Sequence, residues 1–311
     1  MNDIFYPSHD GKTTIHACIW RPEGEIKGVV QIIHGMCEYA ERYTPFARFL
    51  NEHGYLVCAE DHLGHGKSVT AESELGYFNK QRSTKMVLDD IRALHLAVKK
   101  QTEGKPYFVL GHSMGSFICR KYISLYGSEL DGAIVMGTGF QSALTLNFAL
   151  ALVRLSALFC GWHHRSKFIL NLAFSSYNKR FKPAKTKNDW LSKDEENVAR
   201  YEADPLCGFR FTNNGYHFLF SMLKDVCSHK TIEAVPKDLP VYFVAGSDDP
   251  VGSYGKGVKK IKKKFVEADI HDVSLTLYEG GRHEILNDFC KEQVQSDILE
   301  FIEKHTGVEN G

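Results

Sequence analysis

Short runs rich in β-branched and aromatic residues alternate along the chain with longer segments of helical spacing, and this alternation constrains the fold more than any other feature. It predicts an α/β fold with a mostly parallel sheet and helices on both faces. The expected strands are 14–20, 28–33, 55–60, 107–111, 133–136, 241–245 and 273–278. The expected helices are 43–52, 85–100, 114–126, 254–266 and 291–305.

The alternation stops between about Gly139 and Lys237, where helical patterning and aromatic residues continue without a convincing strand. An inserted helical lid is the simplest explanation, and Asp204-Pro205-Leu206 marks its exit. We therefore expect a helical cap at 140–208 and an α/β core formed by 1–139 and 209–311. The end of the chain, 307–311, is expected to fray.

The charge balance of the chain argues against nucleic acid as a partner, because 38 Lys and Arg residues face 38 Asp and Glu residues. The N-terminus lacks a cationic segment followed by an apolar one, so we expect no secretory signal and a cytoplasmic protein. The eight cysteines contain no C-x-x-C pair. In the cytosol they are expected to be free thiols rather than disulfides or zinc ligands.

Two segments invite a membrane interpretation. The most apolar one, 140–160, is interrupted by Asn147, Arg154 and Ser156, so we do not expect it to cross a bilayer. It could line an acyl pocket, touch lipid or pack on the core. The lysines of 259–264 are interleaved with Val258, Ile261 and Phe265, as in a helix with one buried stripe and a solvated face. At most a peripheral membrane contact is expected.

A glycine-flanked serine follows one of the expected strands. Gly111-His112-Ser113-Met114-Gly115 stands between that strand and a helical segment. A G-x-S-x-G pentapeptide is weak alone, but at a strand-to-helix turn it is typical of a nucleophile elbow. The alternative is an ordinary turn with a capping serine. Ser113 is the candidate nucleophile, because the following helix would point its N–H groups at the reacting carbonyl.

A serine nucleophile needs an imidazole base that is held by a carboxylate, and the chain order Ser, acid, His predicts where both lie. Gly246-Ser247-Asp248-Asp249-Pro250 follows one late strand, and Glu279-Gly280-Gly281-Arg282-His283 follows the next. We favour Asp249 as the acid because Pro250 fixes the turn beyond it, whereas Asp248 could cap backbone amides. His283 is the candidate base.

The loop after 28–33 supplies the remaining part of an acyl-transfer site. It reads His34-Gly35-Met36-Cys37-Glu38, an HG-type turn that carries an oxyanion donor in hydrolases. We assign the backbone amides of Met36 and Met114 to the oxyanion hole. Cys37 could make the protein sensitive to oxidants, or it could be a buried, inert thiol.

Five motifs are spread over most of the expected core: HGMCEYAERY at 34–43, DHLGHGKS at 61–68, GHSMG at 111–115, GSDD at 246–249 and GGRH at 280–283. Together they resemble the monoacylglycerol lipase and lysophospholipase branch of the α/β-hydrolase superfamily. The resemblance implies a triad of Ser113, Asp249 and His283, with Met36 and Met114 as oxyanion donors. It also implies a supporting loop of His34, Gly35, Glu38 and Arg42. The chain departs from the usual HGxGEH pattern at Cys37 and Tyr39.

The resemblance and the triad predict hydrolysis of a carboxylic ester through an acyl-enzyme, with a monoacylglycerol or lysophospholipid as first choice of substrate. A short-chain or aryl carboxylesterase, a thioesterase and a small-amide aminopeptidase would share the mechanism. From a different class, the chain could be a silent binding protein with an apolar ligand under its cap. We expect no cofactor and no metal, because Asp61, His62 and His65 have no further ligand cluster at matching spacing.

Overall fold

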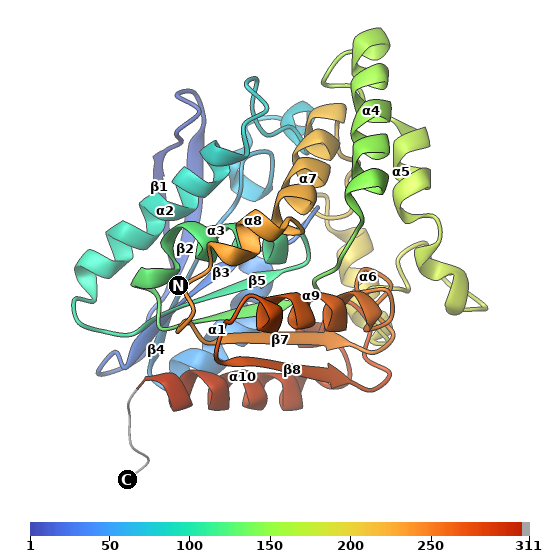
Figure 1. Cartoon of the computed structure of the whole chain (residues 1–311). Coiled ribbons are helices and arrows are strands. Elements are labelled where there is room, and N and C mark those ends of the chain that lie inside the picture. The colour runs from blue at the N-terminus through green and yellow to red at the C-terminus, as the bar shows by residue number, and fades with distance from the viewer. Residues whose placement is uncertain (307–311) are drawn as a thin grey trace.

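A computed structural model describes residues 1–306, so the tail 307–311 lies outside the described residues. One sheet has the strand order β1-β2-β4-β3-β5-β6-β7-β8 (Figure 1). The pairs β1/β2 and β2/β4 are antiparallel, and all other neighbours are parallel. The strands are β1 Asn2–Pro7, β2 Thr14–Trp20, β3 Gly28–Ile33, β4 Tyr55–Glu60, β5 Tyr107–His112, β6 Gly132–Met136, β7 Val241–Gly246 and β8 Val273–Tyr278.

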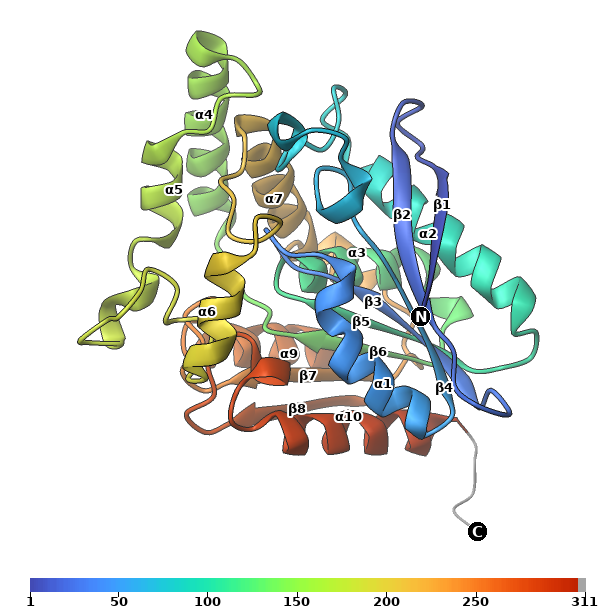
Figure 2. The same ribbon diagram turned by 180° about the vertical axis from the view of Figure 1, so that it is seen from behind.

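Helices cover both faces of this sheet, as the alternation predicted. α1 and α10 pack on one face, and α2, α3 and α9 pack on the other (Figures 1 and 2). The helices are α1 Thr44–Glu52, α2 Thr84–Gln101, α3 Met114–Tyr126, α4 Ala143–Cys160, α5 Lys167–Phe174, α6 Glu195–Ala203, α7 Asn213–Val226, α8 His229–Glu233, α9 Lys256–Glu267 and α10 Lys291–His305.

The expected α/β architecture is confirmed, and each of the five expected helices begins and ends within two residues of its predicted bounds. The strand β1 was not predicted. It pairs along its whole length with β2, yet its burial alternates only between exposed and half-buried. It therefore lacks the apolar run that marks the inner strands, such as β3 and β5, in which every residue is buried.

The expected cap, 140–208, contains α4, α5 and α6. In Figure 1, α4 and α5 stand at the side of the molecule toward which β7 and β8 point. The hydroxyl of Ser142 accepts a hydrogen bond from Thr145 N (3.1 Å) and so starts α4. The next long helix, α7, packs against both α4 and the core helix α3, which connects this segment to the sheet.

Despite the interruptions at Asn147, Arg154 and Ser156, α4 is long and apolar enough to cross a membrane by length and composition, and 22% of its residues are buried. Its buried side chains, Leu146, Leu150, Val153 and Ala157, form one stripe. This stripe lies against protein, and much of the remaining apolar surface faces outward.

Candidate active site

Ser113 occupies the sharp turn between β5 and α3. Its backbone has φ 54° and ψ −120°, in a region that disfavours residues with a side chain, and its N–H donates to Met136 O (3.0 Å). The flanking glycines allow the close approach that this turn requires. A Cβ atom on Gly115 would overlap the carbonyl oxygen of Ile33, and one on Gly111 would overlap Gly115 O. The turn has the geometry of a nucleophile elbow.

The loops after β7 and β8 bring a carboxylate and an imidazole together. His283 Nδ1 lies 2.9 Å from Asp249 Oδ2, and both side chains are buried. The second carboxylate oxygen of Asp249 accepts from Val251 N (2.8 Å), which fixes its orientation. Asp248 is half-exposed and its backbone N–H donates to Gly281 O, so it is Asp249 that pairs with His283.

Ser113 and His283 line one cavity of about 560 Å³, between the edge of the sheet and α4, α5 and α7. Within the described chain, the Ser113 hydroxyl and the His283 ring are not hydrogen-bonded, and such contacts commonly tighten only when substrate binds. The ring of Trp190 lies 5.0 Å from that of His283, centroid to centroid, and shields it on the cap side. Most of the cavity wall is apolar, with Phe148, Leu152, Leu172, Phe220 and Leu223 among its residues.

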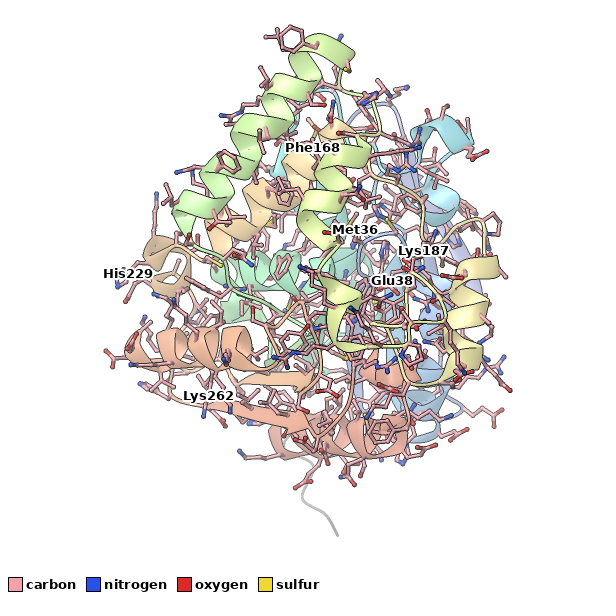
Figure 3. All side chains as sticks on the ribbon, turned by 90° about the vertical axis from the view of Figure 1, so that its right-hand side faces the viewer. Met36, Glu38, Phe168, Lys187, His229 and Lys262 are labelled. Carbon is pink, nitrogen blue, oxygen red and sulfur yellow. The ribbon has the colours of Figure 1, made fainter. Side chains whose placement is uncertain are left out.

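The expected oxyanion donors lie at the same cavity. Met36 and Met114 both line it, and neither backbone N–H has a protein acceptor among the described residues. Met36, Glu38 and Lys187, which are labelled in Figure 3, all line this cavity. An N–H group left without a partner at such a turn is free to donate to a substrate oxygen.

Glu38 joins the loop 34–38 to β5, at whose end Ser113 lies. Its Oε1 accepts from Gly35 N (2.6 Å), from the Tyr43 hydroxyl (2.8 Å) and from His112 Nδ1 (3.0 Å). Burial opposes its ionisation, but hydrogen bonding to His112 and the charge of Arg42 hold the pKa of Glu38 below its ordinary value. The carboxylate is therefore charged at neutral pH and fixes the conformation of the loop.

The sequence did not identify Glu284 and Asn197 as part of this site. Arg42 donates to Glu38 Oε2 (2.8 Å) and binds both oxygens of Glu284 (2.9 Å each). Asn197, on α6, donates to Glu284 Oε2 (2.8 Å). This buried network connects the loop 34–38, the loop after β8 and the segment 140–208. The only sequence signal for Glu284 is its place next to His283.

His34 and Cys37 hold the loop in different ways. His34 Nε2 accepts from His62 N (3.0 Å), and burial lowers the pKa of His34 so that the ring stays neutral. Cys37 has φ 58°, where glycine is favoured, and its thiol donates to Phe209 O (2.8 Å). Burial raises the pKa of the Cys37 thiol, so it is an inert packing group rather than a reactive thiolate.

Comparisons with known proteins identify the relatives of this chain. The family described as serine aminopeptidase, S33, matches residues 24–289. A thermostable carboxyl esterase from Bacillus coagulans, solved in complex with glycerol, is 30% identical, with a TM-score of 0.92 over 98% of both chains. The monoacylglycerol lipase of Mycolicibacterium smegmatis is 27% identical over 92% of each chain. The human monoglyceride lipase is 26% identical over 85% of this chain and 78% of its own.

The family match covers most of the chain, and the esterase structure superposes on nearly all of it. The fold, the elbow and the strand-end loops are shared features of one architecture. The chain therefore belongs to the serine aminopeptidase S33 family, and it is an α/β-hydrolase of the monoacylglycerol lipase-like branch.

Proposed function

We propose that the protein hydrolyses carboxylic esters through an acyl-enzyme on Ser113. His283 takes the hydroxyl proton as Oγ attacks the carbonyl carbon, and the amides of Met36 and Met114 donate to the oxyanion. His283 then protonates the leaving alcohol, and water repeats the sequence to release the acid. Asp249 accepts from Nδ1 and stabilises the imidazolium. The 2.9 Å contact between His283 and Asp249, beside the strained turn of Ser113, carries this proposal.

The apolar cavity supports a substrate with a long acyl chain. Aromatic and aliphatic side chains from α4, α5 and α7 line most of it, and its volume of about 560 Å³ suits a lipid-sized ligand. We infer that a monoacylglycerol or lysophospholipid is the substrate, which agrees with the names of the lipase relatives. The cap 140–208 would then cover the acyl chain.

We also propose that the cap takes its substrate from a lipid surface while the protein remains cytosolic. Leu144, Leu158 and Phe159 are 77–80% exposed and do not line the cavity, and Phe168 on α5 is also exposed (Figure 3). The segment 140–188 holds eight Lys and Arg residues and no Asp or Glu, in a chain with no net charge. Apolar side chains among cations are suited to an anionic bilayer surface.

The catalytic proposal is tested with p-nitrophenyl esters from acetate to palmitate, alongside a monoacylglycerol and lysophosphatidylcholine. We expect turnover that increases with chain length and is lost in Ser113→Ala. A preference for acetate or butyrate would contradict the lipid substrate and favour a small-ester hydrolase. If the wild-type protein hydrolyses nothing and Ser113 resists a fluorophosphonate, the chain is a binding protein.

The surface proposal is tested by sedimentation with vesicles of phosphatidylcholine and phosphatidylglycerol. Leu158→Ser with Phe159→Ser should release the protein from vesicles, while hydrolysis of a soluble short ester stays unchanged. Leu96→Ser, an exposed leucine on α2, is the matched control and should bind as the wild type does. Equal binding by the cap variant and the control would refute the proposed surface.

A further inference from the structure

Three side chains of types that can ligate a metal ion meet on one face of the β1/β2 ladder, away from the candidate active site. The strand register places Asp3 opposite Cys18, and His16 lies two residues earlier on the same face of β2. His16 Nε2 lies 3.5 Å from Asp3 Oδ1. Cys18 Sγ lies 3.9 Å from Asp3 Oδ1 and 3.9 Å from His16 Nε2. One imidazole nitrogen, one thiol sulfur and one carboxylate oxygen therefore form a compact triangle.

The size of this triangle matches a zinc ion. A point equidistant from the three atoms lies about 2.2 Å from each, and zinc bonds to nitrogen, oxygen and sulfur at roughly 2.0–2.3 Å. We propose that Asp3, His16 and Cys18 bind a divalent transition-metal ion of the zinc type, with water in the fourth position. Nitrogen and sulfur donors favour such an ion over magnesium or calcium.

A further carboxylate orients the imidazole. Asp61 Oδ2 lies 2.7 Å from His16 Nδ1, so a proton on Nδ1 leaves the Nε2 lone pair directed at Asp3 and Cys18. Asp61 is itself held by the backbone N–H groups of Ala40 (2.8 Å) and Lys67 (2.7 Å). A carboxylate behind a ligating histidine is the usual arrangement at protein metal sites, where it fixes the tautomer and raises the basicity of the ring.

The surrounding charge favours a cation. His16 and Cys18 are fully buried, while Asp3 is 36% exposed and leaves a path to solvent. Asp3 contacts the thiol, Asp61 contacts His16, and Lys67 is the cation that pairs with Asp3 Oδ2 (3.4 Å) and Glu41 (2.7 Å). On binding, the S–H bond of Cys18 breaks, an S–metal bond forms and the proton leaves to solvent.

The ion would act on the fold rather than on the ester chemistry. Two strands, β4 and β3, separate β2 from β5, which carries Ser113 at its end, so the backbones lie about 14 Å apart at a strand spacing of roughly 4.8 Å. A metal there would fasten β1, an edge strand with little apolar burial, to the sheet. This inference is independent of the ester hydrolase proposal.

The competing arrangement is a protonated His16 bridging Asp61 and Asp3, and the experiment separates the two. Full-length protein with Cys160→Ser, which removes the exposed thiol, is titrated with Co²⁺ and followed by thiolate-to-cobalt charge-transfer absorption. We expect one equivalent to bind, Zn²⁺ to displace it, and saturating Zn²⁺ to raise the Tm by several degrees. Asp3→Asn should weaken Co²⁺ binding at least tenfold.

Cys18→Ala should abolish both the absorption and the Tm shift, whereas Cys58→Ala, another buried thiol, should keep them. A band that survives Cys18→Ala, or no band in the parent protein, would overturn the proposal. If the Tm falls as pH rises and does not change on addition of Zn²⁺, the three side chains form the proton-bridged arrangement instead. Hydrolysis of a short ester should be the same with and without EDTA, provided the assay is run well below the Tm.

Discussion

Two buried glutamates provide a sharp test of the electrostatics, because their pKa values are shifted in opposite directions. Burial raises the pKa of Glu60 well above its ordinary value, with Asp90 adding repulsion, which favours the protonated carboxyl beside the Tyr6 hydroxyl. Glu38 is ionised among Arg42 and its hydrogen-bond donors. Glutamine resembles a protonated carboxyl but not a carboxylate, so the same replacement should have unequal effects at the two sites.

At pH 7 we expect Glu38→Gln to cost about 3–5 kcal/mol of unfolding free energy, because it removes one of the two buried carboxylates that bind Arg42 and the anion that accepts three hydrogen bonds in the loop. Glu60→Gln should instead raise the unfolding free energy, by about 1.4 kcal/mol for each pH unit above 4.5 over which the folded carboxyl keeps its proton. Guanidinium denaturation at pH 5, 6, 7 and 8, followed by tryptophan fluorescence, measures both.

The pH dependence gives an independent check. The raised pKa of Glu60 means that the folded state holds a proton which the unfolded chain loses above the ordinary value near 4.5. This contribution lowers stability by about 1.4 kcal/mol per pH unit as pH rises toward the folded pKa, and Glu60→Gln removes it. The lowered pKa of Glu38 gives stability that is complete above pH 4.5 and lost only as pH falls through the folded value. Equal losses in the two variants, or an unchanged pH slope in Glu60→Gln, would refute the reasoning.

Three further predictions concern the active site. Asp249→Asn should lower kcat by about 10⁴ with the fold intact, while Asp248→Asn should stay near wild type in the same ester assay. Gly115→Ala should give little folded protein by circular dichroism, because its Cβ would overlap Ile33 O. Arg42→Met should lower the unfolding free energy, measured in guanidinium, by about 3–5 kcal/mol, since it leaves two buried carboxylates without their cation. Glu284→Gln keeps a hydrogen-bond acceptor and should lower the unfolding free energy by less. A larger loss in Glu284→Gln than in Arg42→Met would contradict the proposed network.

The sheet was predictable because its inner strands are buried on both faces and read as continuous apolar runs, as in β3 and β7. β1 was not, since its place depends on hydrogen bonds to β2 and not on apolar patterning. Without β1, the proximity of Asp3 to Cys18 could not be foreseen. Because Asp3 lies on a strand that the sequence did not predict, the spacing of residues along the chain could not indicate this set of ligands.

The candidate triad could be located because its members follow strands, and the ends of parallel strands gather at one edge of a sheet. Glu284, Asn197 and Trp190 carry no such signal. Asn197 and Trp190 lie in the segment 140–208, which we predicted as a cap, and their contacts with Glu284 and His283 depend on how this segment packs on the loop after β8. Local patterns predict elements and strand-end loops, whereas contacts between an insertion and the core depend on tertiary packing.

The turn at Ser113 implies that activity and stability oppose each other at a single position. Its backbone angles suit glycine, and a residue with a side chain there costs roughly 1–2 kcal/mol. Ser113→Gly should therefore give an inactive protein that resists denaturation better than Ser113→Ala, although glycine is the more flexible residue in the unfolded chain. Glycine would therefore raise stability and remove the proposed nucleophile, so stability alone does not account for a serine at this turn.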